Sequence, residues 1–493
     1  MSIITVEKVN ESHIKVQSES GIQMELSDFF SFENPQAKFI KYQSNYKYWD
    51  GNIRLYNRRN KLLPAGLLRH LEYFAQERGY KIEGYQHTSE NISAAEVIDF
   101  CKSLDLISNY KSIFPYEHQL KAITKALRYR RVVLESSTSS GKSLIAYVIS
   151  RYLLNKGLKG LIVVPTLGLV EQMHNDFIDY STNNKWDVQN NVYKIYADQN
   201  KFVNYPLFVS TWQSIFDLEN KDWFKQFDFV IFDEAHKCVA KSLIRVAENL
   251  TKASYRIGMT GTVQDGLVPK LTLEGHIGPI TKIATNKEMI EKGISTDVSI
   301  KAIILKYNSA DCYNTAQEKN YQKEIEYIVT NHKRNKFITN LALSLKENTL
   351  ITFQYIEKQG DLLYSLLKKG NKKVFYLQGK SEVEERESVR RICEKENGVV
   401  ILASTLIFQE GVSIKNLHNI ILAMPTKSKI RLLQTIGRGL RLHDNKLKCK
   451  LFDIVDDLRF DDYINYSLKH YLERIKVYNR EEFNYHIYNV NLG

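Results

Sequence analysis

The stretch RVVLESSTSSGKS, from Arg131 to Ser143, decides the fold of this chain. It combines a short β-rich strand, Arg131–Glu135, with a serine-rich turn that opens the helical stretch Lys142–Leu154. A strand-to-helix turn that ends in Gly-Lys-Ser is typical of a phosphate-binding loop, where backbone N–H groups and the helix dipole face the phosphates. We expect Lys142 to reach the β- and γ-phosphates of a nucleotide and Ser143 to hold Mg²⁺. The other loop residues expected to bind the nucleotide are Thr138, Ser139, Ser140 and Gly141.

A second pattern, FVIFDEAH from Phe229 to His236, reads as a buried strand that runs into two acids. Because ligands collect at the carboxyl ends of parallel strands, we expect Asp233 to hold Mg²⁺ and Glu234 to orient and deprotonate the attacking water. The bland alternative is a solvated acid pair, which the Gly-Lys-Ser motif upstream disfavours. No second histidine lies four residues after His236, so we interpret this residue as a coupling residue rather than a metal ligand.

Gln119 lies shortly before the loop strand. A glutamine amide can pair with both a donor and an acceptor on the edge of adenine. A lone glutamine is more often a surface residue, so its position alone makes Gln119 a candidate for binding the nucleotide base.

Working outward, short apolar runs alternate with helical stretches in two successive segments, which predicts two α/β units with parallel sheets. Residues 114–284 are expected to form the first unit and residues 285–457 the second, after an N-terminal α+β accessory domain at 1–113 and before a helical tail at 458–493. The strands expected in the first unit are Arg131–Glu135, Leu161–Pro165, Phe208–Thr211, Phe229–Phe232 and Tyr255–Met259. Those expected in the second are Thr349–Phe353, Lys373–Leu377, Val399–Ala403, Asn419–Ala423 and Lys450–Ile454.

The second unit carries the sequence QTIGRGLR, from Gln434 to Arg441. Arg438 and Arg441 are three residues apart, so on a helix they would share a face. They could then stabilise a transferring phosphoryl group as arginine fingers, which makes hydrolysis depend on closure between the units. A basic surface helix is the alternative if the motif is taken alone.

Composition sets broad limits on the kind of protein. Of the 493 residues, 43% are hydrophobic and 25% are charged, which is ordinary for a globular protein of two or three domains. No run approaches the roughly 18 consecutive apolar residues of a membrane helix, and the N-terminus lacks a secretory pattern. We therefore expect a cytoplasmic protein. Its five cysteines are expected to be reduced, and none is assigned a role. The net charge of +13 favours a polyanionic partner, although an inert basic surface would give the same number.

The order of the motifs resembles that of superfamily 2 helicases and translocases, which have two RecA-like domains. The matching segments are Gln119, Ser139–Ser143, Val164–Leu167, Val209–Trp212, Asp233–His236 (the DEAH sequence), Thr260–Thr262, Gln409–Val412 and Gln434–Arg441. The resemblance implies catalytic roles for Lys142, Asp233, Glu234, Gln434, Arg438 and Arg441 and a coupling role for Thr260 and Thr262. It implies that a set of residues lies along the path of the bound nucleic acid, here called the track: Pro165, Thr166, Thr211, Trp212, Gly379, Thr405 and Gly411. Gly411 is also expected to bind the nucleotide. The chain departs from the family pattern at Ser136, Ser139 and the Thr-Gly-Thr sequence 260–262.

More narrowly, the chain resembles the phage UvsW-type branch-migration helicases along nearly its whole length. The segments that carry this resemblance are Asp28–Glu33, Tyr48–Leu55, Leu62–Gly66, Lys415–His418, Lys427–Lys429 and Phe483–Tyr485. The resemblance implies ATP- and Mg²⁺-dependent branch migration of Holliday junctions, fork regression and unwinding of D-loops or R-loops. It also implies a bacterial host cytoplasm, a monomer, and recombination or replication proteins as partners.

The N-terminal region is cationic and aromatic. Between Gln36 and His70 there are eight Lys or Arg residues and one Asp, interleaved with tyrosines and Trp49. Such a surface suits phosphate contacts and stacking on exposed bases, although the aromatic residues could equally form the core of a small domain. We expect Trp49 to be buried and Arg54, Arg58 and Arg59 to face the DNA.

Three other functions fit parts of the pattern. An RNA helicase would use the same motor, and no motif reports a 2′-hydroxyl preference. The motor subunit of a restriction system would need a nuclease elsewhere. A DNA-binding protein with a catalytically inactive nucleotide-binding fold is disfavoured, because Lys142, both acids and both arginines are present.

Overall fold

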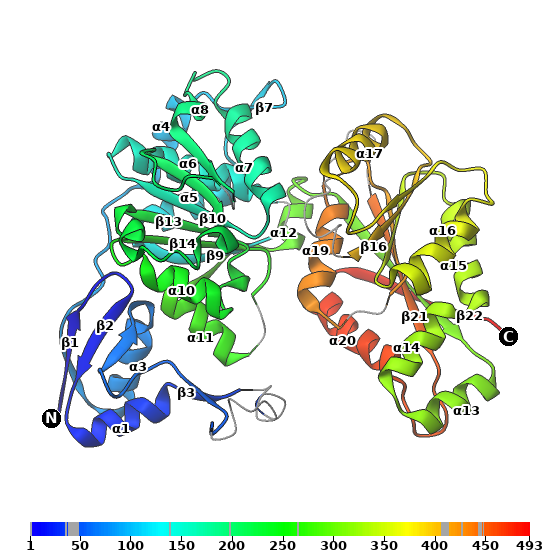
Figure 1. The fold of residues 1–493 in the computed structure, drawn as a ribbon, viewed down its shortest axis with the longest axis horizontal. Helices are drawn as coiled ribbons and strands as arrows, with labels where there is room; N and C mark the ends of the chain where they lie inside the picture. The colour runs from blue at the N-terminus through cyan, green and yellow to red at the C-terminus, as the bar shows by residue number, and fades with distance from the viewer. Residues whose placement is uncertain are drawn as a thin grey trace. The chain divides into compact units, whose positions relative to one another are not determined.

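The computed structural model describes residues 2–34, 37, 49–137, 140–196, 199–263, 266–405, 414–424, 427–441, 446 and 448–493. The chain forms two compact units, and the boundary in the sequence falls between Ile283 and Ala284. Each unit contains one seven-stranded parallel sheet with helices on both faces, and the first also carries a small N-terminal domain with a mixed sheet (Figure 1). The expected fold class, two tandem RecA-like α/β domains with an N-terminal α+β domain, is therefore confirmed.

The N-terminal domain is built on a four-stranded sheet in the order β5-β2-β1-β6. Alternate residues of β1 and β2 are buried, as expected of strands with one face on a core. Helices α1 (Ser20–Phe29) and α3 (Leu68–Arg78) supply the rest of that core, and a hairpin of β3 (Ser31–Glu33) and β4 (Asn52–Arg54) projects beside it. The sheet strands are β1 (Ile3–Lys8), β2 (His13–Gln17), β5 (Leu62–Pro64) and β6 (Lys81–Gly84).

The first RecA-like sheet has the order β11-β12-β10-β13-β14-β9-β15. Its strands are β9 (Arg131–Ser136), β10 (Gly160–Val164), β11 (Val192–Ile195), β12 (Leu207–Thr211), β13 (Phe229–Asp233), β14 (Tyr255–Thr260) and β15 (Ile280–Ala284). All five predicted strands are present, and the two that sequence reasoning did not identify, β11 and β15, are the edge strands. One face is covered by α4 (Ala94–Ser103), α5 (Glu117–Tyr129), α6 (Lys142–Asn155) and α7 (Leu167–Tyr180), and the other by α9 (Trp212–Ile215), α10 (Lys241–Asn249) and α11 (Leu267–His276).

The second sheet has the order β18-β19-β17-β20-β21-β16-β22. Its strands are β16 (Asp297–Lys306), β17 (Thr349–Phe353), β18 (Val374–Leu377), β19 (Val400–Ser404), β20 (Asn419–Leu422), β21 (Lys448–Asp457) and β22 (Asn484–Asn491). Helices α17 (Val383–Lys395), α19 (Lys429–Gly439) and α20 (Tyr466–Arg480) pack on one face, and α15 (His332–Ser344) and α16 (Asp361–Leu367) on the other. Further helices of this unit are α12 (Asn286–Glu291), α13 (Ser309–Glu318) and α14 (Tyr321–Thr330).

The expectation of a wholly helical tail after Asp457 is wrong for its last segment. Residues 466–480 form α20, but 484–491 form β22, which pairs in parallel with β16 at the edge of the second sheet. Most β22 side chains are exposed, so this edge strand lacks the alternation of apolar and polar residues that marks a half-buried strand.

The other expected boundaries, at residues 113 and 284, remain predictions. Val97 and Cys101 of α4 are buried in the same core as α5 and α6, so this helix packs with the first RecA-like sheet.

The five cysteines are all buried and unpaired. In the part of the chain that the structure describes, no helix is long and apolar enough to cross a membrane.

Candidate active site

The predicted phosphate-binding loop lies where β9 ends and α6 begins. Gly141 is the N-cap residue of α6 and has left-handed backbone angles, φ 73° and ψ 45°, which an L side chain rarely adopts. Ser136 is the buried last residue of β9 and is not among the residues with positive φ, so a serine is tolerated there without strain. Ser140 donates its N–H to the Ser137 carbonyl at 3.2 Å. Thr138 and Ser139 lie outside the described residues.

Gln119 packs directly on this loop. It lies in the first turn of α5, is buried, and its Oε1 accepts the backbone N–H of Tyr116 at 2.8 Å. A Cβ added to Gly141 would lie only 2.3 Å from Gln119 Nε2, so the glutamine amide occupies the space that the glycine leaves open. The structure thus brings together two residues that the sequence connected only by order.

The acid pair lies at the carboxyl end of β13, beside β14 and β10. Asp233 Oδ1 accepts the backbone N–H of Glu234 at 3.0 Å, and Glu234 takes a left-handed φ of 49°, which is unusual outside glycine. Burial, together with the neighbouring Glu234 charge, raises the pKa of Asp233 to about 6, against the opposing effect of Lys142. Burial also acts to raise the pKa of Glu234, but contacts with His236 and the charge of Lys142 outweigh it and hold that pKa below its ordinary value. Lys142 therefore acts on both carboxyl groups, which places the loop and the acids in one site.

A hydrogen-bonded chain leads away from Glu234. The His236 Nδ1 lies 3.3 Å from Glu234 Oε2 and 3.0 Å from Thr260 Oγ1. Thr260 donates its hydroxyl proton to the Thr262 carbonyl at 3.0 Å and so accepts from the His236 N–H. His236, Thr260 and Thr262 are all buried. These contacts link Glu234 through His236 to the loop after β14, and the coupling role of His236 stays a prediction.

The structure adds one residue that sequence reasoning missed. Ser143 Oγ and the hydroxyl of Tyr180, the last residue of α7, are 2.9 Å apart. Burial raises the pKa of the Tyr180 phenol, so this hydroxyl stays neutral. The two residues are far apart in the sequence, and only the packing of α6 on α7 brings them together.

Four predicted track residues of the first unit lie at neighbouring strand ends. Pro165 and Thr166 follow β10, while Thr211 and Trp212 join β12 to α9. The strands pair in parallel with Val164 opposite Thr211. Thr211 Oγ1 accepts the Ser214 N–H at 3.3 Å, and the Thr166 hydroxyl is buried with no partner among the described atoms.

The second unit repeats this arrangement. Gly379 follows β18 and Thr405 follows β19, and these strands pair in parallel with Leu377 opposite Ala403. Thr405 donates its hydroxyl to the Phe353 carbonyl at 2.8 Å, while Gly379 is exposed with open space where a side chain would project. Gly411 lies outside the described residues.

Helix α19 carries Gln434 and Arg438 but not Arg441, so the expectation that both arginines share a helical face is wrong. The helix ends at Gly439, where a Cβ would lie 2.6 Å from Cys449 Sγ and where Lys446 Nζ donates to the Gly439 carbonyl at 3.1 Å. Arg441 follows in the connection to β21, and its carbonyl accepts the Thr296 hydroxyl at 3.0 Å.

The N-terminal candidates are partly as expected. Arg54, Arg58 and Arg59 are exposed, and Arg54 forms an ion pair with Asp50 that lowers the pKa of this carboxyl group. Trp49 is half-buried rather than buried, and its Nε1–H donates to the Asn52 carbonyl at 2.9 Å.

Three family models match the chain in succession. "DNA helicase UvsW, N-terminal" matches residues 4–84, "Type III restriction enzyme, res subunit" residues 112–265, and "Helicase conserved C-terminal domain" residues 332–443. The ATP-dependent DNA helicase uvsW of Enterobacteria phage T4 is 35% identical over 98% of each chain. The crystal structure of T4 UvsW matches with a TM-score of 0.52 and 33% identity over 99% of this chain and 100% of that chain.

A more distant match shows the fold alone. The Type ISP restriction-modification enzyme LlaBIII bound to DNA has a TM-score of 0.57 at 16% identity, over 78% of this chain and 32% of that chain. The 35% identity along both full chains, with the three family models in succession, shows that the chain belongs to the UvsW-type family of ATP-dependent DNA helicases.

Proposed function

We propose that this helicase acts on branched DNA, where it drives branch migration of Holliday junctions, regression of forks and unwinding of D-loops or R-loops. The observation that carries the proposal is the similarity to the T4 helicase over 98% of both chains, which includes the N-terminal domain as well as the motor. A motor alone would move along DNA, and a second DNA-binding surface fixed to it is what a branched substrate requires.

In the proposed cycle, Lys142 binds the β- and γ-phosphates and Glu234 takes the proton of the attacking water. The hydrogen bond with His236 and the Lys142 charge together hold the pKa of Glu234 low. Phosphates bound at Lys142 would offset that charge, so the carboxylate becomes a stronger base when ATP is present. The His236–Thr260–Thr262 chain would then report the state of Glu234 to the loop after β14.

The residues present fit a Mg²⁺ ion. The Ser143 hydroxyl and the Asp233 carboxylate are the hard oxygen ligands that this ion takes beside nucleotide phosphates. Bound there, Mg²⁺ would neutralise negative charge on the phosphates.

The second unit would complete the reaction. Gln434, Arg438 and Arg441 are proposed to contact the γ-phosphoryl group held by the first unit. Hydrolysis would then require the two units to close on the ATP, and release of the products would allow the units to open. The strand-end residues Thr166, Thr211, Gly379 and Thr405 are proposed to hold the DNA backbone, since phosphate contacts carry no sequence information and suit a moving protein. We also propose that Arg58 and Arg59 contact DNA, that the protein acts as a monomer in the host cytoplasm, and that it works beside recombination or replication proteins.

The test is ATP hydrolysis with no nucleic acid, single-stranded DNA, linear duplex, a four-way junction or RNA, with Lys142→Ala as the control for contaminating ATPase. We expect the strongest stimulation by the junction, followed by strand displacement from it. Stimulation by RNA alone would overturn the proposal in favour of an RNA remodeller, and stimulation by linear duplex without any effect of branching would favour a simple duplex translocase.

A further inference from the structure

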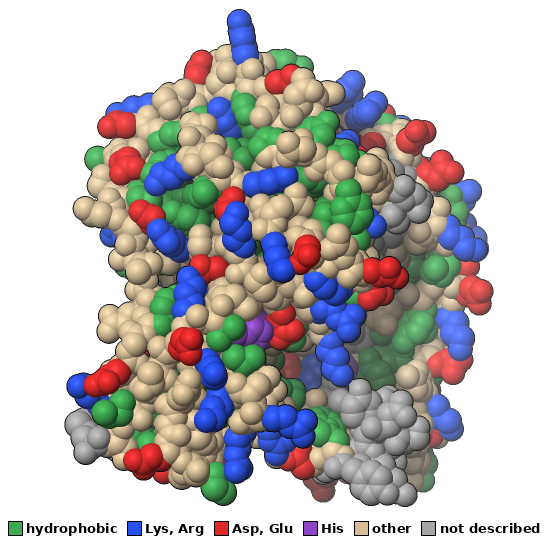
Figure 2. All heavy atoms as spheres, turned by 60° about the vertical axis from the view of Figure 1, so that its left-hand side comes forward, with side chains coloured by type: hydrophobic (Ala, Val, Ile, Leu, Met, Phe, Trp, Pro, Cys, Tyr) green, Lys and Arg blue, Asp and Glu red, His purple; other side chains and the backbone are tan. Residues whose placement is uncertain are grey.

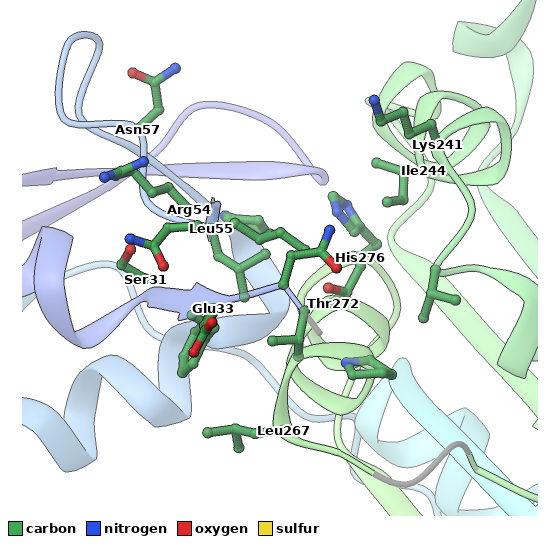
Figure 3. Close-up of a pocket in the computed structure, with 18 of the residues that line it drawn as sticks. Ser31, Glu33, Arg54, Leu55, Asn57, Lys241, Ile244, Leu267, Thr272 and His276 are labelled. Atoms are coloured by element: carbon green, nitrogen blue, oxygen red, sulfur yellow. The ribbon is translucent and has the colours of Figure 1, made fainter. Parts of the chain in front are cut away.

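The first unit contains a large cavity that is separate from the residues of the candidate nucleotide site. It has a volume of about 1300 Å³ and lies between the β3–β4 hairpin and β5 on one side and α10 and α11 on the other (Figure 3). None of the residues that line it belongs to the phosphate-binding loop, the acid pair or the predicted track. All of its walls are within one compact unit.

Buried contacts hold the two walls in a fixed relation. The backbone at Gly66 approaches α11 so closely that a Cβ there would lie 1.9 Å from the Glu274 carbonyl oxygen. Arg256 of β14 is fully buried and donates to Ser12 Oγ at 2.6 Å and to the His276 carbonyl at 2.8 Å. Leu271 of α11 belongs to the core of the N-terminal domain. Because interiors packed this way resist deformation, the groove exists before any ligand binds.

The lining combines flat apolar surfaces with amide groups. Phe32 and Trp49 contribute half-buried aromatic rings, and Leu267 adds an apolar side chain that is 59% exposed. Asn34, Asn52, Asn57 and Asn60 also belong to the lining of this cavity. Aromatic faces stack on nucleobases whatever their sequence, and amides can donate to and accept from base edges.

One residue of the cavity lining, His276, has a buried ring nitrogen without a hydrogen-bond partner among the described atoms. This residue lies at the end of α11 and is 4% exposed, and the nitrogen is its Nδ1. Figure 3 shows its ring among Lys241, Ile244 and Thr272. Burial, with the nearby charges of Arg256, His13 and Arg131, lowers the pKa of His276 to about 3, so the ring is neutral. A buried polar atom without a partner is costly, and a ligand that pairs with it would be favoured.

The charges of the lining decide which part of a nucleic acid fits. Arg54 and Lys241 are matched by Glu33 and Glu248, and Arg54 is already paired with Asp50. On the face shown in Figure 2, Lys and Arg side chains are interspersed with Asp and Glu. A net-neutral groove lined by aromatic rings and asparagines is expected to bind free phosphate weakly and nucleobases more favourably. The cations at its rim would then lie near the sugar-phosphate backbone that links the bases.

We propose that this groove binds a short run of unpaired nucleotides from a DNA strand that leaves the duplex at a branch. The inference rests on the proposed action on branched DNA, and it assigns to the N-terminal domain the task of holding the separated strand. A volume above the range of about 300–1000 Å³ usual for small-molecule pockets fits several stacked nucleotides better than a single base.

The test measures equilibrium binding without ATP to two DNAs of equal length, a fork with one single-stranded arm and a blunt duplex. Phe32→Ala removes a stacking ring, and Leu267→Glu places a charge in the groove at a position too exposed to affect folding. Stacking of about 1–3 kcal/mol per base predicts a loss of about 5- to 150-fold for the fork and a change of less than about twofold for the duplex. Tyr110→Ala, at a 98% exposed tyrosine outside the groove, is the matched control and should leave both affinities unchanged.

A photo-crosslinking arm locates the strand. Iodinated pyrimidines placed in the single-stranded arm should crosslink to peptides that contain residues 31–34 or 49–57. Equal loss of fork and duplex affinity in Leu267→Glu, or crosslinks only to the RecA-like sheets, would overturn the inference. Because these measurements need no ATP, they remain decisive even if branched DNA fails to stimulate hydrolysis, which would count against the proposed function instead.

Discussion

The hydrogen bond between Tyr180 and Ser143 predicts how the metal dependence of hydrolysis can be shifted without touching a metal ligand. In the proposed Mg²⁺ site, Ser143 Oγ would offer a lone pair to the ion, so its proton would need an acceptor elsewhere. The Tyr180 oxygen, 2.9 Å away and buried at the end of α7, is placed to be that acceptor, since either hydroxyl of the pair can donate. The Tyr180→Phe substitution keeps the ring and removes only this partner.

The size of the effect follows from the energy of one hydrogen bond. A net contribution of about 0.5–1.5 kcal/mol corresponds to an increase of about two- to twelvefold in the Mg²⁺ concentration for half-maximal hydrolysis. The maximal rate at saturating Mg²⁺ should stay close to that of the wild type, because the lost bond orients a ligand and takes no part in the reaction itself.

The assay titrates Mg²⁺ at constant ATP and follows phosphate release, with a parallel titration of Mg²⁺-dependent binding of a fluorescent ATP analogue. Tyr129→Phe, at a 43% exposed tyrosine in α5, is the control. An unchanged Mg²⁺ midpoint, or a fall in maximal rate with no shift of the midpoint, would refute the reasoning.

Three further predictions concern the site. Lys142→Ala should abolish hydrolysis while circular dichroism and DNA binding stay those of the wild type; loss of the folded spectrum would show that the residue is structural. Arg438→Ala should lower kcat by about 10³-fold or more, as expected of an arginine finger, with little change in ATP affinity; an equal loss of both would exclude that role. Folding raises the pKa of Asp233 to about 6, so its contribution to stability is present below about pH 4 and is lost as the pH rises through 6. Without nucleotide, Asp233→Asn should therefore melt about 2–8 °C above the wild type at pH 7.5, with a smaller difference at pH 4; a constant difference at both values would contradict the assignment.

Local sequence patterns were enough to predict those parts of the candidate site that lie within one continuous segment of the chain. The strand and the helix on either side of the loop are nearly consecutive in the chain, so the residues from Arg131 onward predicted β9 and the start of α6 at Lys142 as they are found. The same holds for β13 and its two acids. Two failures occur where local signals are weak, whereas the missed strand β16 has an alternating pattern that the sequence analysis overlooked. Strand β22 is mostly exposed at a sheet edge, and α19 ends at Gly439, two residues before Arg441.

The sequence by itself thus determined the chemistry of this protein, since backbone conformation and residue type along short segments specify a phosphate-binding loop and a strand-end acid pair. Only the tertiary structure decided which distant residues lie against these segments. The contacts of Tyr180 with Ser143 and of Gln119 with Gly141 join separate elements across the fold. The groove between the β3–β4 hairpin and α11 likewise joins segments more than two hundred residues apart in the chain. No local periodicity records such pairs, because they arise from how helices and sheets pack once formed.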